Sequence, residues 1–226
     1  MRTSTLLAAT AVIALTAGTA MAAQPMLASP TVGHQVVGKG KGKTLYNQNS
    51  NFGYGIDSQN FSSTDAAYDD AGADDFIVPK GKTWTVNEVD VTGVYYNGSG
   101  PATSEDVTFY ADSSGVPGKA VKKGTFTNLS CTDTSGSFAC KLPKKGVKLA
   151  GGSKGTRYWV SVVANCPFSG CGQWGWVENK TINNDPAVWE NPSGGFGTSC
   201  TSWGVNATCL GSSVYAGDYA FDLKGK

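Results

Sequence analysis

The chain has 226 residues, with 18 Lys or Arg against 17 Asp or Glu, so its formal net charge is +1 at pH 7. Such a balanced chain lacks the basic surface that nucleic-acid-binding proteins need, which argues against nucleic acid as a partner. The length fits one domain that follows a leader segment.

The first 22 residues have the pattern of a secretory signal peptide. Arg2 precedes an apolar run over residues 6–17, and Ala20-Met21-Ala22 supplies a cleavage motif, with cleavage expected after Ala22 or Ala23. The apolar run is shorter than the roughly 20 residues that cross a bilayer, and no later stretch qualifies as a membrane span. We therefore expect a secreted protein, extracellular or periplasmic.

A glycine-rich stretch, GKGKGKT, follows the leader. Its three lysines alternate with glycine, which predicts a flexible linker over residues 23–43. The remainder, residues 44–226, is expected to be a single monomeric domain.

An acidic stretch, DAAYDDAGADDF, comes next. Its carboxylates are hard oxygen ligands that could hold Ca²⁺, which takes about 6–8 oxygens in proteins. The spacing is not that of an EF-hand, because Ala67 occupies the third position. The alternative is a solvated acidic loop that leads into a strand at Phe76. The candidate calcium ligands are Asp65, Asp69, Asp70, Asp74 and Asp75.

The rest of the chain shows alternating apolar residues and no sustained helical period. For example, VTFYAD places Val107 and Phe109 on one face of a strand. In TWTVNEVDVTG the apolar positions change parity between Val86 and Val89, which predicts a β-bulge at 87–88. Strands at this spacing predict an all-β fold, an antiparallel β-sandwich of jelly-roll type.

Six cysteines fall in three close pairs, and an even number in an exported chain indicates disulfides. The segments between the members of each pair are short and rich in turn residues, so local pairing has a small entropic cost. A zinc site is not expected, because the chain has one histidine, His34, and no CxxC motif. The expected bonds join Cys131 to Cys140, Cys166 to Cys171, and Cys200 to Cys209.

Two pairs of tryptophans lead to different expectations. Trp174 and Trp176 share one face of a predicted strand, so we expect them in the core. Trp189 and Trp203 lie in the glycine-rich stretch VWENPSGGFGTSCTSWG, which reads as a surface loop and makes them ligand candidates. Hydrogen bonds to a ligand are expected from nearby Glu190, Asn191 and Asn206.

Several stretches in order, among them ADDFIVPKGKTWTVNEVDVTG, GQWGWVEN, VWENPSGGFGTSC and DYAFDLKG, carry a resemblance to a known family. Over about residues 44–223 the chain resembles a β-sandwich module that recurs in secreted bacterial proteins. The resemblance implies the fold and export, and it assigns no activity and no catalytic residue.

Three classes of function remain open. Abundant aromatic and amide side chains favour a non-catalytic binding or surface-interaction module, with polysaccharide or a cell-surface glycan as the expected ligand. An exported hydrolase of glycosidase type would need two carboxylates, for which Glu178 and Glu190 beside tryptophans are candidates. A serine or cysteine triad is not expected, because His34 lies in the predicted linker. The third class is a structural envelope or matrix protein without a small ligand.

Overall fold

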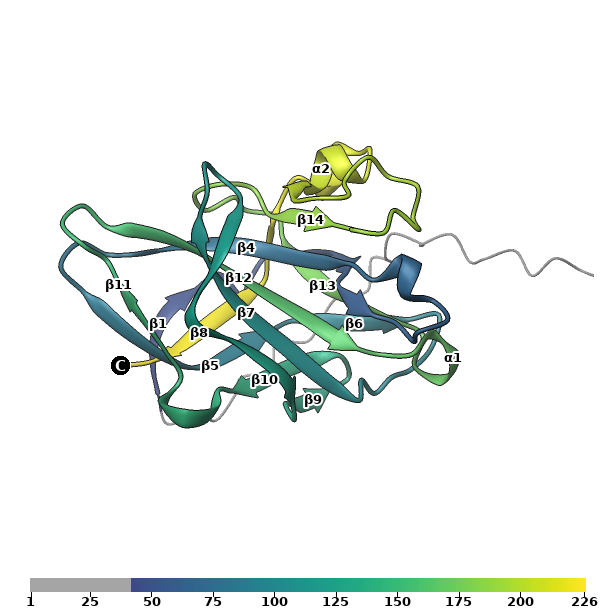
Figure 1. Ribbon diagram of the computed structural model, residues 1–226, viewed down its shortest axis with the longest axis horizontal. Coiled ribbons are helices and arrows are strands. Elements are labelled where there is room, and N and C mark those ends of the chain that lie inside the picture. Colours follow the sequence, from purple (N-terminus) through teal and green to yellow (C-terminus); the bar gives the residue numbers. More distant parts are fainter. Residues whose placement is uncertain (1–41) are drawn as a thin grey trace, which may run out of the picture.

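A computed structural model describes residues 42–226, and it shows an all-β protein whose sheets pack in two layers (Figure 1). The predicted antiparallel sandwich with three disulfides is confirmed. The predicted signal peptide and the linker up to residue 41 lie outside the described residues. Lys43, placed at the end of that linker by the sequence, is the first residue of a strand.

The first layer is a seven-stranded sheet. Its central strand β12 pairs with β4 on one side and β7 on the other. Because β12 is covered on both faces, Trp159 and Val160 both have 0 % exposure although their side chains point in opposite directions. The strands in spatial order are β15 (Gly204–Val205), β14 (Val188–Glu190), β4 (Ala71–Val78), β12 (Thr156–Asn165), β7 (Ser104–Asp112) and β8 (Pro117–Leu129), with β3 (Gln59–Asn60) also paired to β12.

The second layer combines a six-stranded and a four-stranded sheet. The six-stranded sheet contains β1 (Lys43–Asn47), β17 (Phe221–Gly225), β5 (Thr83–Val91), β10 (Ser137–Lys141), β9 (Thr132–Thr134) and β11 (Val147–Ala150). The four-stranded sheet contains β16 (Asp218–Tyr219), β13 (Gln173–Asn179), β2 (Phe52–Asp57) and β6 (Gly93–Tyr96). The chain passes from one sheet to the other at Thr92 and at Ala220, which makes the two sheets neighbours in one layer.

The predicted bulge in β5 is confirmed. Lys224 pairs with Glu88 whereas Gly225 pairs with Val86, so Asn87 is the extra residue in β5. Because of this extra residue, the side chains of Val86 and Val89 both point into the core. Both are fully buried.

The core contains both tryptophans of β13, as predicted. Trp174 stacks on Phe138 with ring centroids 4.8 Å apart, and Trp176 stacks on Tyr219 at 4.5 Å. Both indoles are fully buried. Since each removes on the order of 200 Å² from water, β13 carries a large part of the apolar contact between the layers.

Helical structure is limited to short turns. They are α1 (Phe168–Cys171), α2 (Asn206–Cys209) and the 3₁₀ turns η1 (Ala66–Tyr68), η2 (Pro143–Lys145) and η3 (Ser213–Tyr215). Among residues 42–226, no helix has the length and apolar character that a membrane span requires.

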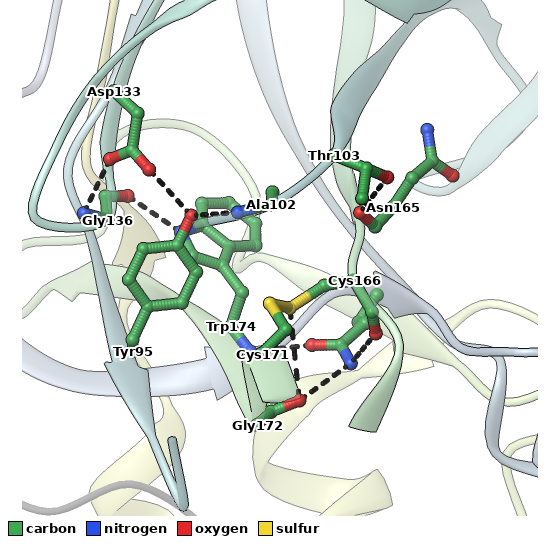
Figure 2. Close-up of a disulfide and its surroundings, with 11 residues drawn as sticks. Tyr95, Ala102, Thr103, Asp133, Gly136, Asn165, Cys166, Cys171, Gly172 and Trp174 are labelled. Carbon is green, nitrogen blue, oxygen red and sulfur yellow. Dashed lines mark hydrogen bonds between the residues drawn. A yellow bond between two sulfur atoms is a disulfide. The ribbon is translucent and has the colours of Figure 1, made fainter. Parts of the chain in front are cut away.

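The three disulfides join the predicted neighbours, with sequence separations of 9, 5 and 9 residues. Figure 2 shows the bond between Cys166 and Cys171 at the turn that contains α1, close to Gly172 and Trp174 of β13. All six cysteines are paired, which is consistent with an oxidising compartment.

Removal of the Cys200–Cys209 bond by a double Cys→Ser substitution should lower the free energy of unfolding by about 2–3 kcal/mol, as expected for so short a loop. Urea denaturation measures this loss. The Cys131→Ser/Cys140→Ser variant is the matched control, because its loop has the same separation of 9 residues. Equal stability of both variants and the wild type would show that the loops are held by packing alone.

Candidate functional site

The outer face of the seven-stranded sheet is covered over β14, β4 and β12, where Val188, Ala73 and Ser161 are buried, and is more exposed over β7 and β8. Residues that pair directly across neighbouring strands point to the same face. The pairing at one level of this sheet runs through Val188, Ala73, Ser161, Thr108 and Thr125, from β14 to β8.

A small apolar cluster, separate from the main core, lies on this outer face. Ala73, Trp159 and Val188 are buried in it, and Tyr110 and Trp203 pack against them while remaining half-buried. The rings of Tyr110 and Trp203 contact each other edge to face, with centroids 6.0 Å apart and planes at 69°. Two large rings are therefore held next to each other at the protein surface.

Glu190, at the end of β14, belongs to the same surface. Its carboxylate accepts the backbone N–H of Trp203, and burial raises its pKa to about 7. Burial raises the pKa of Tyr110, and the nearby charge of Glu190 raises it further. Of the five predicted ligand residues, the structure thus brings together Glu190 and Trp203, and it adds Tyr110.

The expectation that the Trp189 ring lies at the surface is wrong. Trp189 is 2 % exposed, and its Nε1 donates a hydrogen bond to the carbonyl oxygen of Asp57 at 3.0 Å. The glycine-rich sequence around it hid the short strand β14, in which side chains alternate. Val188 and Glu190 face outward in β14, so Trp189 points into the core.

The two predicted ligand asparagines are also interior. Asn191 donates hydrogen bonds to the carbonyl oxygens of Ala67 and Asp69, at 2.9 and 2.8 Å, and accepts one from the backbone N–H of Phe196. Asn206 is fully buried beside the hydroxyl of Tyr219. Asn191 therefore stabilises the fold, and neither position presents its amide to a ligand.

The five aspartates do not form the single calcium site that the sequence suggested. Asp65 accepts hydrogen bonds from two hydroxyls beside η1, while Asp69 and Asp70 each accept a backbone N–H, from Phe61 and Gln59.

The other two aspartates lie inside β4, where alternation separates them. Asp74 points between the layers and Asp75 points outward to Arg157, whose Nε is 2.9 Å from its carboxylate. In the described part of the chain, the compact group of potential ligand atoms is Glu105 with Cys131 and Cys140, and both sulfurs there are in a disulfide.

The two glutamates considered for hydrolysis lie in different sheets. Glu178 is in β13 of the four-stranded sheet, where it is buried and accepts the N–H of Tyr54 at 3.3 Å, whereas Glu190 lies on the outer face of the seven-stranded sheet. Burial raises the pKa of Glu178 to about 7. The structure therefore does not pair these carboxylates across a common cleft.

A groove of about 530 Å³ lies elsewhere, along the edge strand β8. It contains no residue that the sequence proposed as a ligand. Its walls are formed by Lys123, Thr125, Phe126, Thr127 and Leu129 of β8 together with Pro143 and Gly146.

Comparison of the chain with protein-family models, with curated proteins and with solved structures found no match.

Proposed function

We propose that this chain is an exported, non-catalytic binding module that contacts polysaccharide through Trp203, Tyr110 and Glu190. The observation that carries the proposal is the half-buried pair of rings beside a carboxylate at the outer face of the seven-stranded sheet. Sites for small molecules combine aromatic surface with a few placed polar groups, and sugar rings offer both an apolar face and hydroxyls.

The surroundings of Trp203 favour binding over simple coverage of the sheet. The Cys200–Cys209 bond encloses Trp203 in a short loop, and Glu190 accepts its backbone N–H. A ring that is already fixed before binding loses less conformational entropy when a ligand arrives. The predicted leader peptide and the three disulfides support export of the chain.

A glycosidase is the weaker alternative. That chemistry needs two carboxyl groups about 5–10 Å apart on either side of a sugar bond. Glu190 stands on the outer face, and the other candidate, Glu178, accepts backbone hydrogen bonds within a different sheet. The face fits a sugar-binding surface better than an acid–base pair.

The test is retention on insoluble cellulose, chitin and xylan, followed by calorimetric titration with soluble fragments of the polymer that retains the protein. Trp203→Ala and Tyr110→Ala should each weaken binding at least about tenfold, which corresponds to about 1.4 kcal/mol, while the fold remains intact. Stacking on these rings is lost in both variants.

Thr127→Ala, in the groove along β8, is the matched control and should bind like the wild type. If the groove held the ligand, this variant would weaken binding and the two ring variants would not. If the wild type is retained on none of the three polymers, the glycan proposal fails and the structural role takes its place.

A further inference from the structure

Two buried carboxyl groups face each other where β2 ends and β4 begins. The side chains of Asp57 and Asp70 lie within hydrogen-bonding reach of each other, and both residues are 3 % exposed. Asp57 also accepts a hydrogen bond from Nε2 of Gln173 at 2.6 Å, and Asp70 accepts one from the backbone N–H of Gln59 at 2.7 Å.

One carboxyl of this pair comes from β2 in the four-stranded sheet, and the other comes from the residue before β4. Asp74, further along β4, is also fully buried but differs from this pair. Both of its oxygens accept N–H groups: Oδ1 from the backbone of Asp75 at 2.7 Å, and Oδ2 from Nε2 of Gln48 at 2.6 Å and the backbone of Tyr219 at 2.5 Å. Such donors favour an ionised carboxylate at Asp74.

No positive charge is placed to neutralise this pair within residues 42–226. The titratable groups around it are Asp69, Tyr96 and Tyr219, and the hydroxyl of Tyr96 donates a hydrogen bond to Asp57.

The hydrogen-bond pattern indicates a proton rather than a metal ion. Oδ1 of Asp57 and Oδ2 of Asp70 have no hydrogen-bond donor among the described residues. The other oxygen of each carboxyl receives an N–H group, which a cation would repel. Two carboxylates so close cannot both ionise at low cost, whereas one protonated carboxyl can donate to the other.

We propose that Asp57 and Asp70 share a proton, and that this protonated pair forms a joint between the four-stranded sheet and the start of β4 that loosens in alkaline solution. The joint is a pH-sensitive device built into the fold. It depends on neither the proposed ligand nor the face around Trp203.

The direction of the pH effect follows from the difference in carboxyl pKa between the folded and the unfolded state. Burial raises the pKa of Asp57 to about 7, and it raises the pKa of Asp70 well above the usual range. An unfolded aspartate releases its proton near pH 4. The stabilisation is therefore complete below about pH 4 and declines as the pH rises through about 7.

The wild-type melting temperature should accordingly be roughly 10 °C or more higher at pH 5 than at pH 8.5. Unfolding in urea at pH 6 should release protons, which a pH-stat measures directly. Release of no protons, or uptake, would overturn the proposal without any variant.

Asp57→Asn assigns the effect to the pair, because an amide can donate to the remaining carboxylate without titrating. It should reduce the difference in melting temperature between pH 5 and pH 8.5. Asp65→Asn, at the half-exposed turn beside η1, should retain the wild-type difference. Equal pH profiles for the two variants would place the titration elsewhere.

Hydrogen exchange measures the local effect, because the amide of Gln59 donates to Asp70. Above pH 8 this amide should lose protection by more than the tenfold per pH unit expected from base catalysis, ahead of amides in β12. Uniform loss across the protein would contradict a local joint. Stabilisation by millimolar Ca²⁺ at pH 8.5 that Asp57→Asn abolishes would show a metal ion in place of the proton.

Discussion

Replacing Trp176 with alanine should lower the free energy of unfolding by about 3–5 kcal/mol, the usual cost of emptying a large core site. Trp176 is fully buried between the layers, stacked on Tyr219, and its Nε1 donates to the carbonyl oxygen of Ala220 at 3.0 Å. The variant would lose the stacking and one of the two hydrogen bonds to that carbonyl oxygen, which keeps the backbone N–H of Thr92 at 3.2 Å. Urea denaturation at pH 5 measures the loss.

Two further variants make this result specific. Trp176→Phe keeps an apolar ring but loses the hydrogen bond, so its loss should be smaller, about 1–3 kcal/mol. Trp203→Ala removes a half-exposed indole and should cost less than Trp176→Ala. If the two alanine variants were equally unstable, Trp203 would be a core residue and its proposed contact with a ligand would lose its basis.

The features that the sequence predicted correctly depend on short-range regularities. Alternation assigned Trp174 and Trp176 to one buried face, and the change of parity after Val86 located the bulge in β5. The disulfides followed from short separations, because a loop of a few residues between two cysteines keeps them close in the folded chain.

The errors arose where a strand was concealed by polar or flexible composition. In DDAGADDF the strand β4 begins at Ala71, so Asp74 and Asp75 are strand residues on opposite faces and not parts of one loop. Charged residues are rarely found in a strand that is covered on both sides. In β4 they are accommodated by partners from distant parts of the chain: Gln48 bonds to Asp74, and Arg157 bonds to Asp75.

Tyr110 could have been identified from the sequence. The alternation that places Val107 and Phe109 in the core places Thr108 and Tyr110 on the opposite face of β7. What the sequence could not show is that Trp203, 93 residues later, packs against that tyrosine. Long-range contacts of this kind are set by the register of strands and the path of loops.

Gln59 is the clearest case of a residue whose role requires the structure. It lies in the two-residue strand β3 and is fully buried. Its Nε2 donates to the carbonyl oxygens of Cys166 and Gly172, at 2.5 and 3.1 Å, and its Oε1 accepts the N–H of Trp174 at 2.6 Å. One side chain thus connects both ends of the disulfide-bonded turn to β13.

Gln59→Leu should therefore lower the free energy of unfolding by at least about 3 kcal/mol, because each buried backbone group left without a partner costs about 1–3 kcal/mol. The exchange of the Trp174 amide should accelerate in the same variant. Thr103→Ala is the matched control: the Thr103 hydroxyl donates to the carbonyl oxygen of Asn165 at 2.8 Å in an exposed position near the same disulfide (Figure 2). Water can replace that bond, so we expect a loss of about 1 kcal/mol or less. Comparable losses in the two variants would mean that water also reaches the Gln59 site, and that the turn is held by its disulfide rather than by this amide.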